Sequence, residues 1–455
     1  MPLESINPAT GELLERFTEL SAAQAAAAVA QADEAFGPWG QSGFSRRGSL
    51  LIKAAAILRS EKNSLARMMS EEMGKPILQA LAEIEKCATV CAYYAENGEA
   101  MLAPERIAAD GADSYVRFDP LGVVLAVMPW NFPFWQVFRF AAPALMAGNV
   151  CLLKHASNVQ RCAAGIEEVL RRAGLPQHVF SVLRASADRV EALIALPQVR
   201  AVTLTGSDRA GREVAAAAGR NLKKVVLELG GSDPFIVLDD ALLPKCVAAA
   251  VSARMINNGQ SCIAAKRFIV ARDVYDRFTK AFVAAVAELR TGSPLDESND
   301  LGPLARADLL EELERQVGES VRLGAVVLTG GGRLGKGPGY FFQPTVLAGV
   351  APGMPAYDEE LFGPVAALIA AADEEDALRI ANDTAFGLGA SIWSADRQRA
   401  EKLAARVEAG SVFINGMVKS DPRLPFGGVK MSGFGRELSS YGIKEFVNIK
   451  TVVIS

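Results

Sequence analysis

The chain has 455 residues, half of them hydrophobic, and its 48 lysines and arginines nearly balance 52 acidic residues. This length exceeds one simple core, so we expect two or three domains, and the balanced charge argues against a nucleic-acid partner. The amino terminus lacks the basic and apolar regions of a signal peptide, and no apolar run is long enough to span a bilayer. The six cysteines do not form a disulfide framework in a chain of this length. We therefore expect a cytoplasmic protein without a membrane partner.

Helices are predicted for much of the first hundred residues. Ser21 is placed to cap a helix over 21–36, and a second helical stretch over 46–73 ends at Gly74, which a lysine and a proline follow. Residues 114–119 then alternate apolar and polar side chains, which predicts an exposed strand.

From residue 122 onward, short apolar runs alternate with helical stretches, which is typical of repeated βαβ units and a mostly parallel sheet. The first series of predicted strands comprises 122–128, 150–153, 180–183, 201–205 and 225–229. The second series comprises 234–238, 268–270, 326–328, 390–393 and 411–415. A last strand over 446–454 is free to pair outside its own domain. The pattern predicts an α/β protein with two such domains, joined near residues 229–231.

A G-x-G-x-x-G fingerprint is missing after the first strand of either series, so any dinucleotide must be held in another way. The candidate replacement is the segment 205–211 (TGSDRAG), in which Gly206 and Ser207 stand at the start of a helix. Backbone N–H groups and the positive end of a helix dipole favour phosphate at such a place. An ordinary strand-to-helix turn is the alternative explanation of the same residues.

Cys262 follows the turn-forming run Asn257-Asn258-Gly259-Gln260, which places its thiol in a loop or at a helix edge. A partly ionised cysteine is a good nucleophile for a carbonyl carbon, although an isolated cysteine is more often structural. The chain has only two histidines, so the general base of an enzyme is expected to be a carboxylate.

Glu228 is a candidate for that base because it lies inside an apolar strand, directly before Leu229 and two glycines. Burial raises the pKa of a carboxyl group toward neutrality, as the activation of water requires. An ion pair with Lys223 or Lys224 is the alternative.

Asn131 lies between Pro129 and Pro133, in a turn that follows the first strand of the first series. Its amide is a candidate donor of an oxyanion hole, together with the backbone N–H of Cys262. The alternative is an asparagine selected for its tolerance of turn geometry.

Seven short motifs stand in a fixed order along the chain: 129–133 (PWNFP), 153–154 (LK), 205–207 (TGS), 227–231 (LELGG), 259–262 (GQSC), 360–364 (ELFGP) and 425–428 (PFGG). The ordered set resembles the aldehyde dehydrogenase superfamily over nearly the whole chain. Residues 226–238 and 432–438 are most similar to short bacterial NAD(P)-dependent succinate semialdehyde dehydrogenases.

The resemblance implies a role for each matching residue. Cys262 matches the nucleophile, Glu228 the base, Asn131 the oxyanion donor and Glu437 a second carboxylate that relays protons. The residues matching the cofactor site are Trp130, Lys154, Ser157, Gly206, Ser207, Glu360 and Phe362. Among these, Lys154 and Glu360 match contacts to the two riboses, and Gly206 with Ser207 matches the pyrophosphate turn. No metal is implied.

The resemblance also implies the aldehyde dehydrogenase fold, with two doubly wound α/β domains and a small bridging sheet. The cofactor domain is expected over 1–101 and 121–229, the catalytic domain over 230–431, and the oligomerisation segments over 102–120 and 432–455. A homodimer or homotetramer is implied.

NADP or NAD is the expected cofactor, and the residue that bears on this choice is Ser157. Family members strict for NAD carry a glutamate at this position, which repels a 2′-phosphate. A serine removes that repulsion, so we expect NADP to be accepted and NAD to remain usable.

Arg139 matches an arginine that binds the substrate carboxylate, so a small semialdehyde, most simply succinate semialdehyde, is the expected substrate. A helix-surface arginine is the alternative. A second arginine of that pocket is Ile256 here, and the expected substitutes are Arg254, Lys419, Ser420 or Arg423. Glutarate semialdehyde or an aromatic aldehyde remains open as substrate. CoA-dependent acyl release is disfavoured by Glu228, and a non-catalytic binding protein by the intact nucleophile, base and oxyanion donor.

Overall fold

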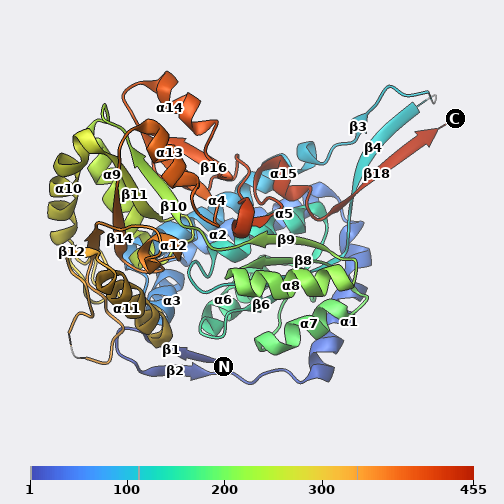
Figure 1. Ribbon diagram of the computed structural model, residues 1–455. Helices are drawn as coiled ribbons and strands as arrows, with labels where there is room; N and C mark the ends of the chain where they lie inside the picture. The colour runs from blue at the N-terminus through green and yellow to red at the C-terminus, as the bar shows by residue number, and fades with distance from the viewer. Residues whose placement is uncertain (1–2, 111–112, 336, 455) are drawn as a thin grey trace.

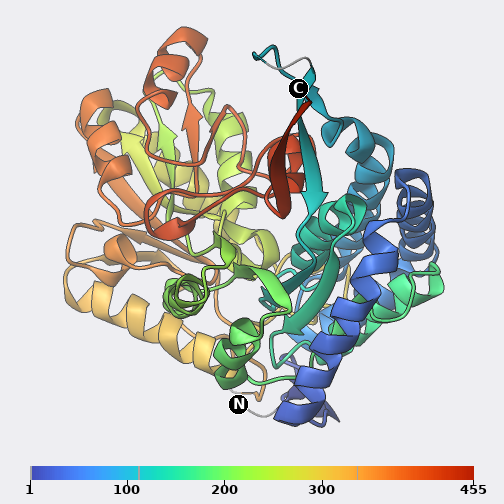
Figure 2. The same ribbon diagram turned by 90° about the vertical axis from the view of Figure 1, so that its right-hand side faces the viewer.

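The computed structural model describes residues 3–110, 113–335 and 337–454, so the first two residues of the amino terminus lie outside it (Figure 1). In these residues the strands form a six-stranded sheet, a seven-stranded sheet and two small sheets. Figure 2 shows the two large sheets side by side, each in its own half of the molecule.

The six-stranded sheet has the order β17-β9-β8-β5-β6-β7 and is parallel except for β17. Its strands are β5 (Val123–Met128), β6 (Val150–His155), β7 (Phe180–Val182), β8 (Val199–Thr205), β9 (Lys224–Glu228) and β17 (Gly433–Phe434). The strand order reverses between β5 and β8, which is the point of a doubly wound sheet where ligands bind at the carboxyl ends of the strands.

The seven-stranded sheet has the order β12-β13-β14-β11-β10-β15-β16 and is parallel except for β12. Its strands are β10 (Asp233–Val237), β11 (Ala265–Ala271), β12 (Val326–Thr329), β13 (Thr345–Ala348), β14 (Val365–Ala371), β15 (Gly389–Trp393) and β16 (Ser411–Ile414). In the apolar runs of β10, β11 and β14 nearly every side chain is buried, as helices on both faces of a parallel sheet require.

The third sheet, with the order β18-β4-β3, forms an arm that extends away from the body and has the carboxyl terminus near its tip (Figure 1). It comprises β3 (Glu105–Arg106), β4 (Asp113–Pro120) and β18 (Val447–Ile454), and β1 (Glu4–Ile6) pairs with β2 (Leu13–Arg16) at the other end of the molecule. The final strand therefore pairs with a segment more than 300 residues earlier.

The helices of the first half are α1 (Ala22–Gly40), α2 (Phe44–Ser60), α3 (Lys62–Met73), α4 (Ile77–Met101), α5 (Trp135–Ala147), α6 (Gln160–Arg172), α7 (Val190–Ala195) and α8 (Asp208–Arg220). Those of the second half are α9 (Leu243–Met255), α10 (Arg272–Ala287), α11 (Ala307–Arg322), α12 (Pro355–Asp358), α13 (Glu374–Asn382), α14 (Arg397–Ala404) and α15 (Ser439–Ile443). Three short 3-10 turns are η1 (Ala187–Arg189), η2 (Ile256–Gly259) and η3 (Lys430–Ser432). None of the helices in the described ranges is long and apolar enough to cross a membrane.

Parts of the fold differ from the prediction, and the β1–β2 pair and the bounds of α4 were not predicted. The single helix expected over 46–73 is two helices, α2 and α3, because Glu61 between them has a non-helical backbone (φ −105°, ψ 15°). Strands β13 and β14 were not predicted, since an Ala-rich apolar run such as 365–371 fits a buried helix equally well. Within the segment 432–455, β17 pairs with β9 of the six-stranded sheet.

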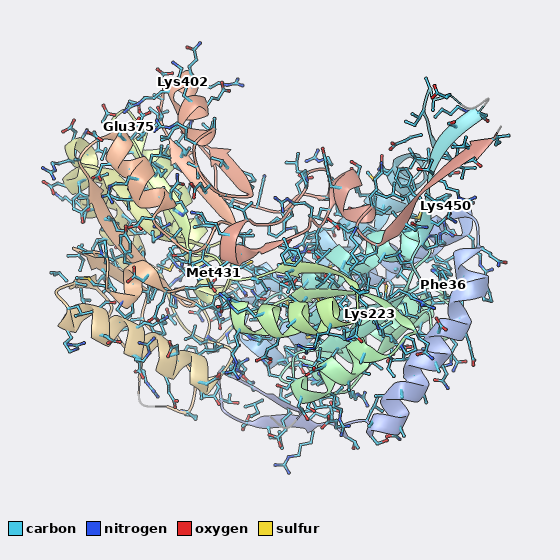
Figure 3. The ribbon with its side chains drawn as sticks, turned by 45° about the vertical axis from the view of Figure 1, so that its right-hand side comes forward. Phe36, Lys223, Glu375, Lys402, Met431 and Lys450 are labelled. Carbon is cyan, nitrogen blue, oxygen red and sulfur yellow. The ribbon has the colours of Figure 1, made fainter. Side chains whose placement is uncertain are left out.

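The two large sheets face each other at the ends of their strands, where one cavity is lined by residues that follow β5, β8 and β9 and by residues that precede β11 and β14. Strands β5, β8 and β9 end at this junction, whereas β10, β11 and β14 begin there. In Figure 3, Met431 lies at the junction beside α8, Glu375 and Lys402 lie at the far end of the second half, and Lys450 lies on β18 of the arm. Loops from both sheets therefore converge on one place.

Candidate active site

Cys262 lies on a closely held loop between η2 and β11, and its side chain is half-buried. Just before this loop, in η2, Asn257 and Asn258 have left-handed backbones (φ 56° and 59°), a conformation that asparagine tolerates. The side-chain amide of Asn258 donates to the carbonyls of Gly74 at 2.8 Å and Pro303 at 2.9 Å. These contacts fix the loop that carries the thiol.

Arg254 holds the same loop from within. Its guanidinium donates to four backbone carbonyls, those of Ala265 (3.0 Å), Gly259 (2.6 Å), Leu361 (3.3 Å) and Gly363 (2.5 Å). The side chain is fully buried and does not line the cavity beside Cys262. Nη1 and Nη2 of Arg254 are thus bonded to backbone carbonyls, so this geometry gives no support to the prediction that Arg254 binds substrate.

Asn131 lies in the turn between β5 and α5, and its side chain is buried against the nucleophile loop. Its amide nitrogen donates to the carbonyl of Gln260 at 3.1 Å, and the amide of Asn257 donates to the Asn131 carbonyl at 2.7 Å. Asn131 and Cys262 line the same cavity. Because an amide group has two N–H donors, one remains for an oxyanion next to the sulfur.

The turn that carries Asn131 is held from two further sides. Glu83 of α4 accepts hydrogen bonds from the backbone N–H groups of Phe134 (3.0 Å) and Trp135 (2.9 Å), at the start of α5. The Nε2 atom of His155 lies 2.9 Å from a backbone carbonyl of the turn, and burial lowers the pKa of this imidazole to about 4. His155 is thus neutral and structural, and the sequence alone did not predict either contact.

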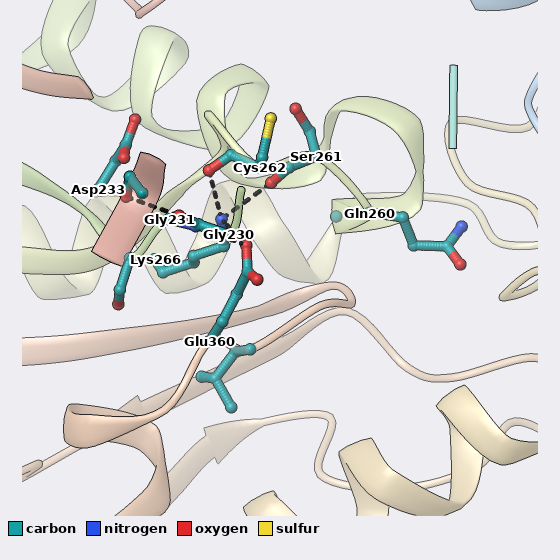
Figure 4. Close-up of polar contacts among 12 residues, drawn as sticks. Gly230, Gly231, Asp233, Gln260, Ser261, Cys262, Lys266 and Glu360 are labelled. Carbon is teal, nitrogen blue, oxygen red and sulfur yellow. Dashed lines mark hydrogen bonds and ion pairs between the residues drawn. The ribbon is translucent and has the colours of Figure 1, made fainter. Parts of the chain in front are cut away.

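Lys266 connects the nucleophile loop to Glu360 (Figure 4). Its buried ammonium group donates to the carbonyls of Ser261 (2.9 Å) and Cys262 (2.8 Å) and lies 3.1 Å from a Glu360 oxygen. The same oxygen accepts the backbone N–H of Gly231 at 3.0 Å. Lysine at this position was not singled out in the sequence, since only the fold brings it beside Glu360.

The two glycines after Glu228 are required by close packing around Glu360 and Cys262. A Cβ atom on Gly230 would lie 2.5 Å from a Glu360 oxygen, and one on Gly231 would lie 2.7 Å from the Cys262 carbonyl. Only glycine permits these approaches.

Glu228 ends β9, and its side chain is buried. Neither carboxylate oxygen accepts a hydrogen bond from the described residues, and the two lysines considered as partners bind elsewhere: Lys223 to backbone carbonyls and Lys224 to Glu445. Burial, followed by repulsion from Glu437, raises the pKa of Glu228 well above its usual value. The ion-pair alternative is therefore excluded, and the carboxyl group has the electrostatic character of a general base.

Burial raises the pKa of the Cys262 thiol to about 12, and the nearby charges of Lys266 and Arg139 act in the opposite direction. The thiol is thus protonated at neutral pH, and a base must take its proton when the sulfur attacks.

Arg139 lies in α5 and is buried, not on a helix surface. Its Nε atom forms an ion pair with Glu437, its Nη2 atom donates to Thr205 at 3.3 Å, and its guanidinium lies 4.7 Å from the centre of the Phe426 ring. Among the described residues, Nη1 has no hydrogen-bond acceptor. Arg139 lines a small cavity that also includes Cys262.

That small cavity, of about 80 Å³, lies on the Arg139 side of the thiol and is lined by residues of α4, α5, the nucleophile loop and the segment 417–426. Ser420, Lys419 and Ile256 line it as well. Arg423 does not, because its exposed side chain pairs with Asp421. Lys86, which the sequence did not single out, also lines it.

On the other side of the thiol a larger cleft follows the carboxyl ends of β5, β8 and β9, in two cavities of about 400 and 340 Å³. The first includes Cys262 and five predicted cofactor residues: Trp130, Gly206, Ser207, Glu360 and Phe362. The second lies between α7 and α8 and includes Lys154. The amino end of α8, where Ser207 caps the helix, lies between them.

This cleft suits an elongated dinucleotide. The rings of Trp130 and Phe362 meet edge to face at 5.7 Å in the cavity beside Cys262, while Lys154 lies in the cavity at the other end. The N–H groups at the start of α8 are available to a pyrophosphate between the two. Ser157 lies in the turn after β6, half-buried and outside the walls of either cavity.

The geometry can be compared with known proteins. A model of the aldehyde dehydrogenase family matches residues 1–452. The chain belongs to this family. The predicted superfamily and fold class are therefore confirmed, and the two large sheets are the two α/β units of the aldehyde dehydrogenase fold.

Among similar proteins, the succinate-semialdehyde dehydrogenase (NADP+) 1 of Mycobacterium tuberculosis is 51% identical over 100% of both chains. The structure of succinic semialdehyde dehydrogenase from Streptococcus pyogenes in complex with NADP+ has a TM-score of 0.97, with 37% identity over 99% of both chains. An NAD-dependent aldehyde dehydrogenase from Sinorhizobium meliloti also has a TM-score of 0.97, with 34% identity over 100% of this chain and 91% of its own.

Within residues 3–110, 113–335 and 337–454, the His, Cys, Asp and Glu side chains form no group of three or more that could hold a metal ion.

Proposed function

We propose that this aldehyde dehydrogenase oxidises succinate semialdehyde to succinate with NADP, and more slowly with NAD. The observation that supports this choice of substrate is the small cavity. Its walls combine Cys262 with Arg139 and Ser420 around a space suited to a short chain that bears a carboxylate. The names of the Mycobacterium tuberculosis and Streptococcus pyogenes relatives support the same substrate and cofactor.

In the proposed reaction, the sulfur of Cys262 attacks the aldehyde carbon and forms a thiohemiacetal. Its oxyanion is stabilised by the free N–H of the Asn131 amide and by the Cys262 backbone N–H. The thiol proton passes to water at the half-exposed Cys262 side chain. Glu228, whose carboxylate oxygens accept no hydrogen bond from the described residues, is kept for the hydrolysis step.

The bound nicotinamide supplies the hydride acceptor. Glu360, held by Gly231 and Lys266, positions the cofactor ribose, and Trp130 with Phe362 forms the apolar wall next to the sulfur. After oxidation the acyl group is a thioester on Cys262, and Glu228 activates the water that hydrolyses it. Glu437, next to Glu228 in the buried charge cluster, is the proposed proton relay.

The proposed preference for NADP over NAD rests on two residues, Lys154 and Ser157. Lys154 supplies a positive charge in the outer cavity, and Ser157, in the turn after β6, does not repel a 2′-phosphate.

The division into domains and the assembly are also proposals. We propose a cofactor domain over 1–101 and 121–229, a catalytic domain over 230–431, and the arm as the contact of a homodimer or homotetramer. The arm exposes Ile449, Val453 and Ile454 on β18, which supports this role. Light scattering at known protein concentration distinguishes a monomer, a dimer and a tetramer.

The experiment that tests the function measures NADPH and NADH formation with succinate semialdehyde and, as an uncharged control of equal carbon count, butanal. We expect kcat/KM for succinate semialdehyde to exceed that for butanal by about 100-fold, as one or two charge-assisted contacts provide. Equal turnover of the two aldehydes would remove the substrate proposal and leave the enzyme class intact.

A further inference from the structure

The small cavity beside Cys262 contains a cation that the sequence analysis did not identify. Lys86 projects from α4, and its ammonium group donates to the Ser420 hydroxyl at 2.6 Å. The same ammonium lies 4.1 Å from the centre of the Trp135 ring. Ile256, at the position where the family resemblance places a second arginine, lies in the wall of this cavity. Lys86 therefore provides a positive charge in a cavity that lacks that arginine.

The charges around Lys86 leave it without a counterion. Among the described residues, no carboxylate lies within ion-pair distance of its ammonium group, whereas the Nε atom of Arg139 is already paired with Glu437. Glu83, one turn earlier on α4, is paired with Lys75. Three cations line this cavity: Arg139 is paired with Glu437, and Lys419 is exposed to solvent. Lys86 is the half-buried one, and no carboxylate of the described residues pairs with it.

The electrostatics agree with this geometry. Burial, and then repulsion from Arg139, lowers the pKa of Lys86 to about 8, with Cys87, Glu83 and Asp421 acting weakly in the opposite direction. Two like charges facing one small cavity disfavour each other until an anion enters between them. A bound carboxylate would reduce the repulsion between Lys86 and Arg139 and would serve as the counterion of Lys86.

We propose that Lys86, with Ser420, binds the distal carboxylate of the semialdehyde and is a specificity-determining residue of this enzyme. It takes the place of the arginine that Ile256 replaces, and Arg139, held by Glu437, makes the second and weaker contact. This inference rests on the proposed oxidation of a semialdehyde, and it names the residue that selects the charged substrate.

The test compares Lys86→Gln, Lys86→Arg and wild type on succinate semialdehyde and butanal. Lys86→Gln is expected to lower kcat/KM for succinate semialdehyde by about 10- to 100-fold, mainly through KM, because a hydrogen bond to a charged group is lost. The loss for butanal is expected to be at least tenfold smaller, and Lys86→Arg is expected to restore part of the preference. The matched control is Lys53→Gln, on the exposed face of α2.

A second readout is the pH dependence of the ratio of kcat/KM for the two aldehydes, since titration of the nucleophile and base affects both substrates alike. As the pH rises through about 8, the free Lys86 loses its charge, so the ratio is expected to fall. The groups facing Lys86 are Arg139 of α5, Glu83 and Cys87 of α4, and Asp421 of the following loop. In Lys86→Arg the fall is expected to disappear, because arginine remains charged.

Two outcomes overturn the proposal: an equal loss with both aldehydes, which indicates a structural role, or no loss with either. Calorimetric binding of succinate to wild type and Lys86→Gln keeps this proposal separate from the proposed function. If succinate semialdehyde is a poor substrate but succinate binding still depends on Lys86, the proposed function is rejected and the role of Lys86 in carboxylate binding is retained. If succinate semialdehyde is preferred and succinate binding is independent of Lys86, the function stands and the role of Lys86 is rejected.

Discussion

The guanidinium of Arg139 in α5 forms a buried ion pair with the carboxylate of Glu437, which lies just before α15. The pair joins the six-stranded sheet to the carboxyl-terminal segment, next to Glu228. Burial of both charges costs desolvation energy that their attraction largely offsets, so the intact pair adds little to the stability of the fold. Removal of one partner leaves a buried charge without a counterion, which lowers the stability far more.

Glu437→Ala is therefore expected to destabilise the protein by about 3–5 kcal/mol, because it leaves a buried arginine without its counterion. Thermal unfolding, followed by circular dichroism, measures the effect. The control is Glu401→Ala, which removes the partner of Arg397 in an exposed pair and should leave the midpoint almost unchanged. Equal shifts in the two variants would contradict the importance of the buried pair.

Glu228→Gln is expected to separate the two halves of the reaction. Acyl-enzyme formation should still give a burst of NADPH, while steady-state turnover falls by about 100- to 10,000-fold, because the base for hydrolysis is missing. Stopped-flow absorbance measures burst and steady state in one trace. The control is Cys262→Ala, which should show neither phase, and a lost burst in Glu228→Gln would place this residue in acylation as well.

The rate of hydrolysis in the wild type should rise with pH. The pKa of Glu228 is raised by burial and by Glu437, so at low pH the carboxyl is protonated and is not a base. As the pH rises through that raised pKa, the ionised fraction and kcat should both rise, in a range above the usual titration of glutamate. A kcat that is flat across this range would show that deacylation is not limiting or that Glu228 is not its base.

Ser157→Glu is expected to shift the cofactor preference toward NAD. A carboxylate near Lys154 repels a 2′-phosphate, so kcat/KM with NADP should fall by about 10-fold or more while the value with NAD is retained. Initial rates with each cofactor measure the shift. Ser157→Gln has a side chain of similar size without the negative charge, so it separates the effect of charge from the effect of size. An equal fall in kcat/KM with NADP in both variants would rule out repulsion as the cause.

Arg254→Met is expected to reduce activity with all aldehydes alike, because it removes a donor from four backbone carbonyls around the Cys262 loop. The rate of Cys262 alkylation by iodoacetamide and the kcat/KM ratio for succinate semialdehyde and butanal are the readouts. A positioning role changes the alkylation rate and leaves the ratio constant. A selective loss of the semialdehyde would instead restore Arg254 as a substrate ligand.

Several features of this protein follow from local sequence alone. The cap at Ser21, the end of α3 at Gly74 and the strands of the first series have the predicted types and nearly the predicted bounds, because capping groups, glycine and runs of β-branched residues act over a few residues. The ordered motifs also determined the family, since turn residues and the nucleophile loop recur as short contiguous strings.

The tertiary structure decided which charged groups face one another. Lys86 and Ser420 are joined across 334 positions, and Arg139 meets Glu437 only after the carboxyl-terminal segment packs on the first sheet. Arg254 illustrates the same limit, since its sequence neighbourhood fits a substrate ligand and its burial makes it a loop anchor. Local propensities act along the chain, whereas desolvation and ion pairing depend on distances in space that sequence spacing does not contain.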